Sequence, residues 1–88
     1  MTEIVLLHKK TDSVRLEDIR SEMHRRGPPK IRASQAHGRW YAHEGTHRLT
    51  IASEEGIPVE FLQVPWKWTR NALEKARYRT TVVKVKVL

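Results

Sequence analysis

Residues 45 to 48, which read Gly-Thr-His-Arg, have the types and spacing best suited to chemistry on an anion. They follow a run of strand-forming residues and precede helical spacing, so the chain is expected to pass from strand to helix at the glycine. The first N–H groups of a helix lack partners within it and point, with the positive end of the dipole, above the turn. Gly45 allows close backbone approach, Thr46 adds a hydroxyl, and His47 and Arg48 add donors and charge. The pattern predicts a pocket for phosphate or carboxylate.

Glu44 directly precedes this turn. A carboxylate beside an anion site is where a general base or a magnesium ligand is expected, so Glu44 is the candidate catalytic residue. The alternative is a plain surface position, which we slightly prefer. The structural alternative for the whole turn is that Thr46 only caps the helix and Arg48 only pairs with Glu44 or Glu55.

Histidines at 37, 43 and 47 raise the question of a metal site. Residues 43 to 47 match the His-Glu-x-x-His pattern literally, but a zinc protease needs both histidines on one helical face. Here the glycine at 45 indicates the start of the helix rather than its middle. The sequence therefore predicts no metal site.

The elements that position this segment can be read from periodicity. Leu16, Ile19 and Met23 form an amphipathic stripe, and Gly27 followed by two prolines should end that helix at Arg26. Strands and a second helix are then expected in the order βαββαβ. The strands are Ile4 to Leu7, which we expect to be buried on both faces, Lys30 to Ala33, Arg39 to His43 after a turn at Gln35 to Gly38, and Pro58 to Val64, and the second helix runs from an N-cap at Thr46 to Glu55, closed by Gly56.

The last quarter of the chain is the most basic part. Residues 66 to 88 contain seven basic residues and one acid. A further helix up to Ala76 is expected, then a strand in which Val83, Val85 and Val87 alternate with lysines, at the edge of the sheet. Nucleic-acid contacts are predicted for Arg25, Arg26, Lys67, Trp68, Arg70, Lys75, Arg77 and Arg79.

Trp66 and Trp68 flank Lys67, and interleaved aromatic and basic residues can stack bases and follow phosphates. The alternative is that both tryptophans are core residues. We expect one of the pair to be packed and the other exposed.

Composition limits what the chain can be. Its 88 residues have a net charge of +7 and no cysteine, which excludes disulfide scaffolds, thiolate zinc sites and thiol nucleophiles. Residues 1 to 88 are expected to form a single α+β domain, with a small mixed sheet and two or three helices. No apolar run is long enough to cross a bilayer and no signal peptide is apparent, so a soluble cytoplasmic protein without a membrane partner is expected. The charge favours nucleic acid, although a basic surface that meets an acidic protein is equally compatible with composition.

Residues 39 to 59 resemble the second conserved segment of the ParB/sulfiredoxin superfamily. Gly45 and Arg48 match the glycine and the arginine shared by both branches, and His47 matches the sulfiredoxin histidine. The resemblance covers roughly residues 2 to 64 and implies a ParB/sulfiredoxin-like core over 1 to 65, with a basic extension over 66 to 88. It implies a nucleotide- or phosphate-binding pocket at Gly45 to Arg48. Thr46 stands where sulfiredoxin has its catalytic cysteine, so sulfinic acid reduction is not expected.

Three functions follow as expectations. The first is a stand-alone ParB-like module, of phage or plasmid kind, that binds nucleic acid or a nucleotide phosphate and lacks the helix-turn-helix of ParB. The second is a nucleotide hydrolase, phosphotransferase or nuclease, with a nucleotide and Mg²⁺ as cofactor and Glu44 as catalytic residue. The third is a protein-binding inhibitor or regulator. Whether the chain is an enzyme stays open at this point.

Overall fold

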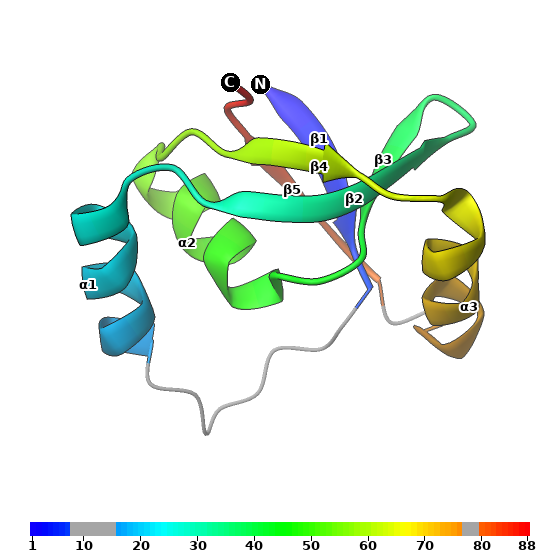
Figure 1. Cartoon of the computed structure of the whole chain (residues 1–88), viewed down its shortest axis with the longest axis horizontal. Helices are drawn as coiled ribbons and strands as arrows, with labels where there is room; N and C mark the ends of the chain where they lie inside the picture. The colour runs from blue at the N-terminus through cyan, green and yellow to red at the C-terminus, as the bar shows by residue number, and fades with distance from the viewer. Residues whose placement is uncertain (8–15, 77–79) are drawn as a thin grey trace.

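The structure is a computed structural model and describes residues 1–7, 16–76 and 80–88. Within these residues it has three helices and a five-stranded mixed sheet, which confirms the predicted α+β class (Figure 1). None of these helices combines the length and the apolar composition needed to cross a bilayer. In chain order the elements are β1 (Thr2–Leu6), α1 (Leu16–Arg26), β2 (Lys30–Ala36), β3 (Arg39–Ala42), α2 (Thr46–Glu55), β4 (Glu60–Gln63), α3 (Trp66–Ala76) and β5 (Thr81–Val85).

The sheet has the strand order β4-β2-β3-β1-β5, so the hairpin of β2 and β3 lies near its middle. β1 runs parallel to β3 and β4 parallel to β2, whereas β5 runs antiparallel to β1. His37 and Gly38 make the hairpin turn with φ of 52° and 75°, the positive values that favour a tight two-residue turn. β2 therefore extends to Ala36, and the turn consists of two residues instead of the four predicted from Gln35 to Gly38.

One face of the sheet, called the core face here, packs against α1 and α2. Ala33, Ala42 and Leu6 are neighbours across β2, β3 and β1 on this face, since the register pairs Ala42 with both of the others. The small side chains leave room for residues of the two helices. The buried cluster consists of Ile4, Leu6, Met23, Ile31, Ala33, Ala42, Leu49, Ile51, Ala52, Val59 and Val85.

The opposite face, called the α3 face, carries Val5, Ser34 and Tyr41 as cross-strand neighbours. Ser34 Oγ donates to the carbonyl of Val64 at 2.9 Å and shares a 2.8 Å hydrogen bond with the hydroxyl of Thr69 in α3. Both faces of β1 are covered, because Ile4 to Leu7 are all buried, as predicted. Figure 1 shows α1 and α3 at opposite ends of the molecule.

α1 ends where the sequence predicts. Gly27 adopts a φ of 81° and its N–H donates to the carbonyl of Met23 at 2.9 Å, which satisfies one of the last carbonyls of the helix. Met23 is buried and Ile19 packs against the core, whereas Leu16 is 38% exposed. The predicted stripe is thus buried only in its second half.

The two edges of the sheet approach each other at one end. β5 is an edge strand, as predicted, and β4 is the other edge. Val59, just before β4, forms a parallel bridge with Val87, just after β5. Its N–H donates to Lys86 at 2.8 Å, and its carbonyl accepts from Leu88 at 2.9 Å. The sheet is therefore curled into a partly closed barrel at this end.

Candidate functional site

Residues 45–48 start α2 as predicted, but the capping residue differs from the expectation. Gly45 is the N-cap, with φ 84° and ψ 28°, and no side chain in the described part of the protein caps the helix. Thr46, the predicted N-cap, is the first residue of α2 and is 7% exposed. Its carbonyl accepts a hydrogen bond from the Thr50 hydroxyl at 2.8 Å. The prediction for Thr46 is therefore wrong, because a left-handed glycine already turns the chain into the helix.

Gly45 is required by the core as well as by its dihedral angles. A Cβ atom at this position would lie 2.7 Å from Cδ1 of Ile31, which is buried under the start of α2. Its positive φ is also one that residues with a side chain rarely adopt. The sequence predicts that this glycine allows a ligand to approach the backbone, and the structure gives it a second role in packing α2 against β2.

A cleft of about 670 Å³ lies between α1, the turn that follows α1, and the first turn of α2. This volume is within the usual range of small-molecule sites. The predicted segment Gly45 to Arg48 forms one side of it. The other lining residues are Ile19, Glu22, Met23, Arg26, Gly27, Pro28, Pro29 and Lys30.

The cleft is basic because three cationic residues reach it from three segments. Arg26 comes from the end of α1, Lys30 from the start of β2, and Arg48 from the first turn of α2. Among the described residues, Glu22 is the one acidic residue that lines the cleft, and its carboxylate pairs with Arg26 at 3.1 Å. Within the described residues, neither Lys30 nor Arg48 forms an ion pair. With the positive end of the α2 dipole directed at the same space, the arrangement favours an anion.

The wall formed by α1 is apolar in its deeper part. Met23 is buried, Ile19 is half-buried, and Pro28 and Pro29 continue this surface beyond the end of α1. A site with an apolar wall and cations on the other side fits a ligand that has both a hydrophobic part and an anionic group.

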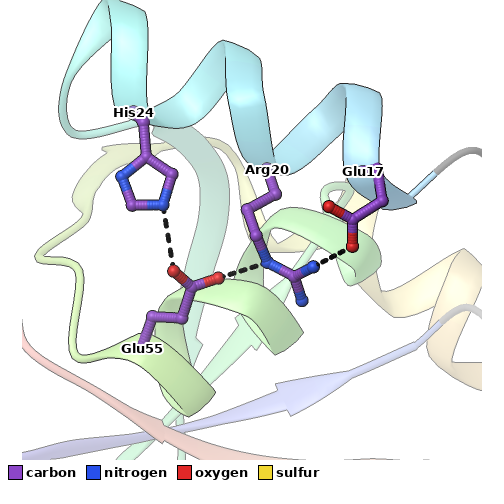
Figure 2. Close-up of polar contacts among 4 residues, drawn as sticks. All are labelled: Glu17, Arg20, His24 and Glu55. Carbon is purple, nitrogen blue, oxygen red and sulfur yellow. Dashed lines mark hydrogen bonds and ion pairs between the residues drawn. The ribbon is translucent and has the colours of Figure 1, made fainter.

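A network of ion pairs fastens α1 to α2 beside the cleft (Figure 2). Arg20 of α1 donates to Glu17 on its own helix and to Glu55 at the end of α2. His24, one turn further along α1, contacts the other carboxylate oxygen of Glu55 at 3.0 Å. Because each wall of the cleft is one of these two helices, the network fixes the spacing of the walls.

The same contacts alter proton affinities. The hydrogen bond from Arg20 lowers the pKa of Glu55, and the contact with His24 acts in the same direction, against the opposing effect of partial burial. The pKa of Arg20 is raised, first by its hydrogen bond to Glu55 and then by the charge of Glu17. Glu55 therefore stays ionised to a lower pH than a glutamate without these partners.

The structure does not bring the candidate catalytic residue into the cleft. Glu44 lies beside Arg32 of β2, with 3.8 Å between Oε1 and Nε, and is not among the residues that line the cleft. Arg25 is exposed on α1 but does not line the cleft either. The hydrolase alternative therefore lacks a positioned carboxylate at Glu44.

The other predicted nucleic-acid contacts fall at the far end of the molecule. Lys67, Arg70 and Lys75 are exposed on α3, and Arg70 pairs with Glu74 at 3.3 Å. Arg77 and Arg79 lie outside the described residues. Trp66 packs against Tyr41 and Trp68 is 49% exposed, which confirms the expectation of one packed and one exposed tryptophan.

The histidine pattern does not occupy a single helix. His43 precedes the N-cap glycine, whereas His47 is the second residue of α2. Among the residues that the structure describes, no group of three or more acidic, histidine or cysteine side chains could hold a metal ion.

Two basic residues have positions that sequence reasoning missed. Lys30 lines the cleft. The only sequence feature that pointed to it was its position directly after the two prolines that stop α1. Lys86 reaches the other end of α2, where Nζ lies 3.6 Å from the position a Cβ on Gly56 would take. Its charge therefore lies at the negative end of the α2 dipole and contributes to the stability of α2.

Comparisons with protein-family models, with curated proteins and with solved structures give no match for this chain.

Proposed function

We propose that this protein binds a phosphate group, of a nucleotide or of a nucleic-acid backbone, in the cleft between α1 and α2. The observation that supports the proposal is the meeting of Arg26, Lys30 and Arg48, from three segments, at the start of a helix. Charged donors around a phosphate form the stronger class of hydrogen bond, and the helix dipole adds to them.

A relationship to the ParB/sulfiredoxin superfamily belongs to the same proposal. It rests on the sequence around Gly45, His47 and Arg48, and it favours a nucleic-acid-associated module of phage or plasmid kind. Thr46 in place of a cysteine leaves the site without a thiol, so binding rather than redox chemistry is the proposed activity.

Calorimetric titration of Arg48→Ala tests the proposal. The probes are CTP and ATP, each with and without Mg²⁺, together with short DNA and RNA, at about 50 and 200 mM salt. Because a charge-assisted hydrogen bond is lost, we expect affinity for the bound phosphate compound to fall about tenfold or more. Arg48→Lys should retain part of it, since a lysine binds phosphate as a point charge.

Arg39→Ala is the matched control, because Arg39 is also an exposed arginine but lies at the hairpin, away from the cleft. It removes the same charge and should change affinity by less than about twofold. Equal losses in both variants would contradict the proposal, since only net charge would then matter. Binding of an acidic protein with no affinity for any phosphate compound would select the protein-binding alternative.

A further inference from the structure

A row of three side chains, of which Arg32 and Leu62 are exposed and His43 is half-buried, crosses the α3 face of the sheet. Leu62 of β4 is the register partner of Arg32 of β2, and the N–H of His43 donates to the carbonyl of Arg32 at 2.8 Å. These three residues therefore lie side by side on neighbouring strands, over about 10 Å. Leu62 is 40% exposed, and the Arg32 side chain is 57% exposed.

Trp68 extends this row from α3. Its ring centroid lies 6.5 Å from that of His43, at an interplanar angle of 49°. The other two tryptophans are engaged internally, because Trp40 packs on Phe61 at 4.8 Å and Trp66 packs on Tyr41. Trp68 alone among the three is as much exposed as buried.

The orientation of Trp68 follows from how α3 is anchored. Thr69, the next residue, is fully buried and bonded to Ser34 at 2.8 Å. Adjacent residues of a helix point about 100° apart, so fixing Thr69 against the sheet turns Trp68 toward the margin of α3. We name Arg32, His43, Leu62 and Trp68 together the platform.

The charges around the platform are mainly positive. Lys67 is exposed next to Trp68, and Lys30 precedes Arg32 by two residues on β2, in the neighbourhood of the cleft. The carboxylates nearby are Glu44, at 3.8 Å from Arg32, and Glu60, the register partner of Lys30. Among the described residues named here, three cations stand against two carboxylates, a small positive excess. The exposed ring of Trp68, which can stack on a base, favours nucleic acid over an acidic protein as the occupant.

We infer that the platform binds unpaired bases of a single-stranded nucleic acid. Trp68 offers a ring face for stacking and half-buried His43 packs beside it. Leu62 adds an apolar surface, and the Arg32 guanidinium contacts phosphate or stacks. A duplex is disfavoured because its bases are already stacked and paired. The inference deepens and rests on the proposed function, since Lys30 joins the two sites along β2.

Trp68→Ala tests the inference, and its exposed position on a helix makes folding of the variant expected. The probes are single-stranded DNA and RNA of about ten nucleotides and the corresponding DNA duplex. We expect the wild type to bind the single strands more tightly and with quenched tryptophan fluorescence. Trp68→Ala should lose about fivefold to 100-fold in single-strand affinity, and Trp68→Phe should retain most of it. Leu16→Ala, which truncates an exposed residue of α1, is the control and should bind as the wild type does.

The outcomes separate this inference from the proposed function. If Trp68→Ala binds single strands as the wild type does, or if duplex binds as tightly as single strands, the inference is overturned while Arg48-dependent nucleotide binding still stands. If single-strand binding depends on Trp68 but not on Arg48, the platform stands and the cleft proposal fails. Self-association that Trp68→Ala abolishes, without any nucleic-acid binding, would instead make the platform a contact between copies and overturn the inference. A preference between the DNA and RNA strands identifies which nucleic acid is the ligand.

Discussion

The cleft and the platform both contain basic residues but arrange them differently. At the cleft, cations from α1, β2 and α2 meet in one hollow, and the Arg20 network holds two of those segments together (Figure 2). At the platform, a single half-exposed tryptophan and an arginine lie on an open face. The contrast is between cations gathered in a hollow and an aromatic ring on an open face, so the proposed phosphate site and the proposed base-stacking site depend on different residues. Experiments that affect one region and spare the other test this division.

The largest expected effect is a loss of stability when the packing of α2 against β2, beside the cleft, is disturbed. Gly45→Ala places a Cβ 2.7 Å from Ile31 Cδ1 and forces a positive φ on a residue with a side chain. We expect it to lower the free energy of unfolding by about 2 to 4 kcal/mol, measured by urea denaturation. Gly38→Ala is the control, because its φ of 75° is similar but no atom lies within 4 Å of its Cβ position. It should cost only about 1 kcal/mol.

A second substitution sharpens this test. Ile31→Val removes the Cδ1 atom in question and by itself costs about 0.5 to 1.5 kcal/mol. The double variant Ile31→Val/Gly45→Ala should lose less stability than the sum of the losses of the two single variants, since Ile31→Val removes the atom with which the new Cβ clashes. Strict additivity would show that the backbone angle alone makes glycine necessary.

Salt dependence distinguishes charge from stacking. Single-strand affinity is expected to fall with salt, and Arg48→Ala should reduce the slope of log K against log salt by about 0.7, because one phosphate contact is lost. Trp68→Ala should weaken binding while leaving the slope unchanged. Fluorescence titrations at several salt concentrations measure both. A reduced slope in Trp68→Ala would mean that the platform acts through charge.

The ion-pair network is expected to give a smaller effect that depends on pH. The pKa of Glu55 is lowered in the folded state, so folding favours its ionised form. The resulting stability is present above the unfolded pKa and is lost as the pH falls through the folded one. Glu55→Gln should therefore be less stable than the wild type at neutral pH, and the difference should shrink in acid. Urea midpoints across the acidic range measure it, and a difference that does not change with pH would show that the charge of Glu55 is unimportant.

The smallest effect is expected at the other end of α2. Lys86→Met removes a charge next to the C-terminal end of the helix while keeping much of the side-chain length. We expect a loss of about 0.3 to 1 kcal/mol in stability, reduced by salt, and unchanged affinity for nucleic acid. A clear loss of nucleic-acid binding would instead assign Lys86 to the binding surface.

Local sequence patterns predicted the elements well because their causes are local. The stop of α1 at Gly27, the hairpin and the end of α2 at Gly56 each depend on glycine or proline at one position. Gly45 shows the limit. No side chain fits at position 45 because Ile31 occupies the space. Ile31 lies fourteen positions earlier in the chain and contacts Gly45 only in the folded protein.

The composition of the cleft could not be predicted for the same reason. Arg26 was expected to contact nucleic acid and Arg48 to bind phosphate, but nothing in their spacing shows that α1 ends beside the start of α2. The sequence also could not show that the Glu44 side chain lies beside Arg32, because this depends on how the two segments pair in the sheet. One of Trp66 and Trp68 was expected to be exposed, but the sequence did not show which, because the exposure of Trp68 follows from the packing of its neighbour Thr69 against Ser34.

The bridge between Val59 and Val87 affects how the sheet behaves toward other chains. An edge strand with unpaired N–H and C=O groups is a template on which another chain can add a strand, and this is a common first step in aggregation. Here the two edges use part of their free hydrogen-bonding groups on each other. Before another chain could add a strand at that end, the hydrogen bonds of Val59 with Lys86 and Leu88 would have to break. The curled end of the sheet is therefore protected against strand addition.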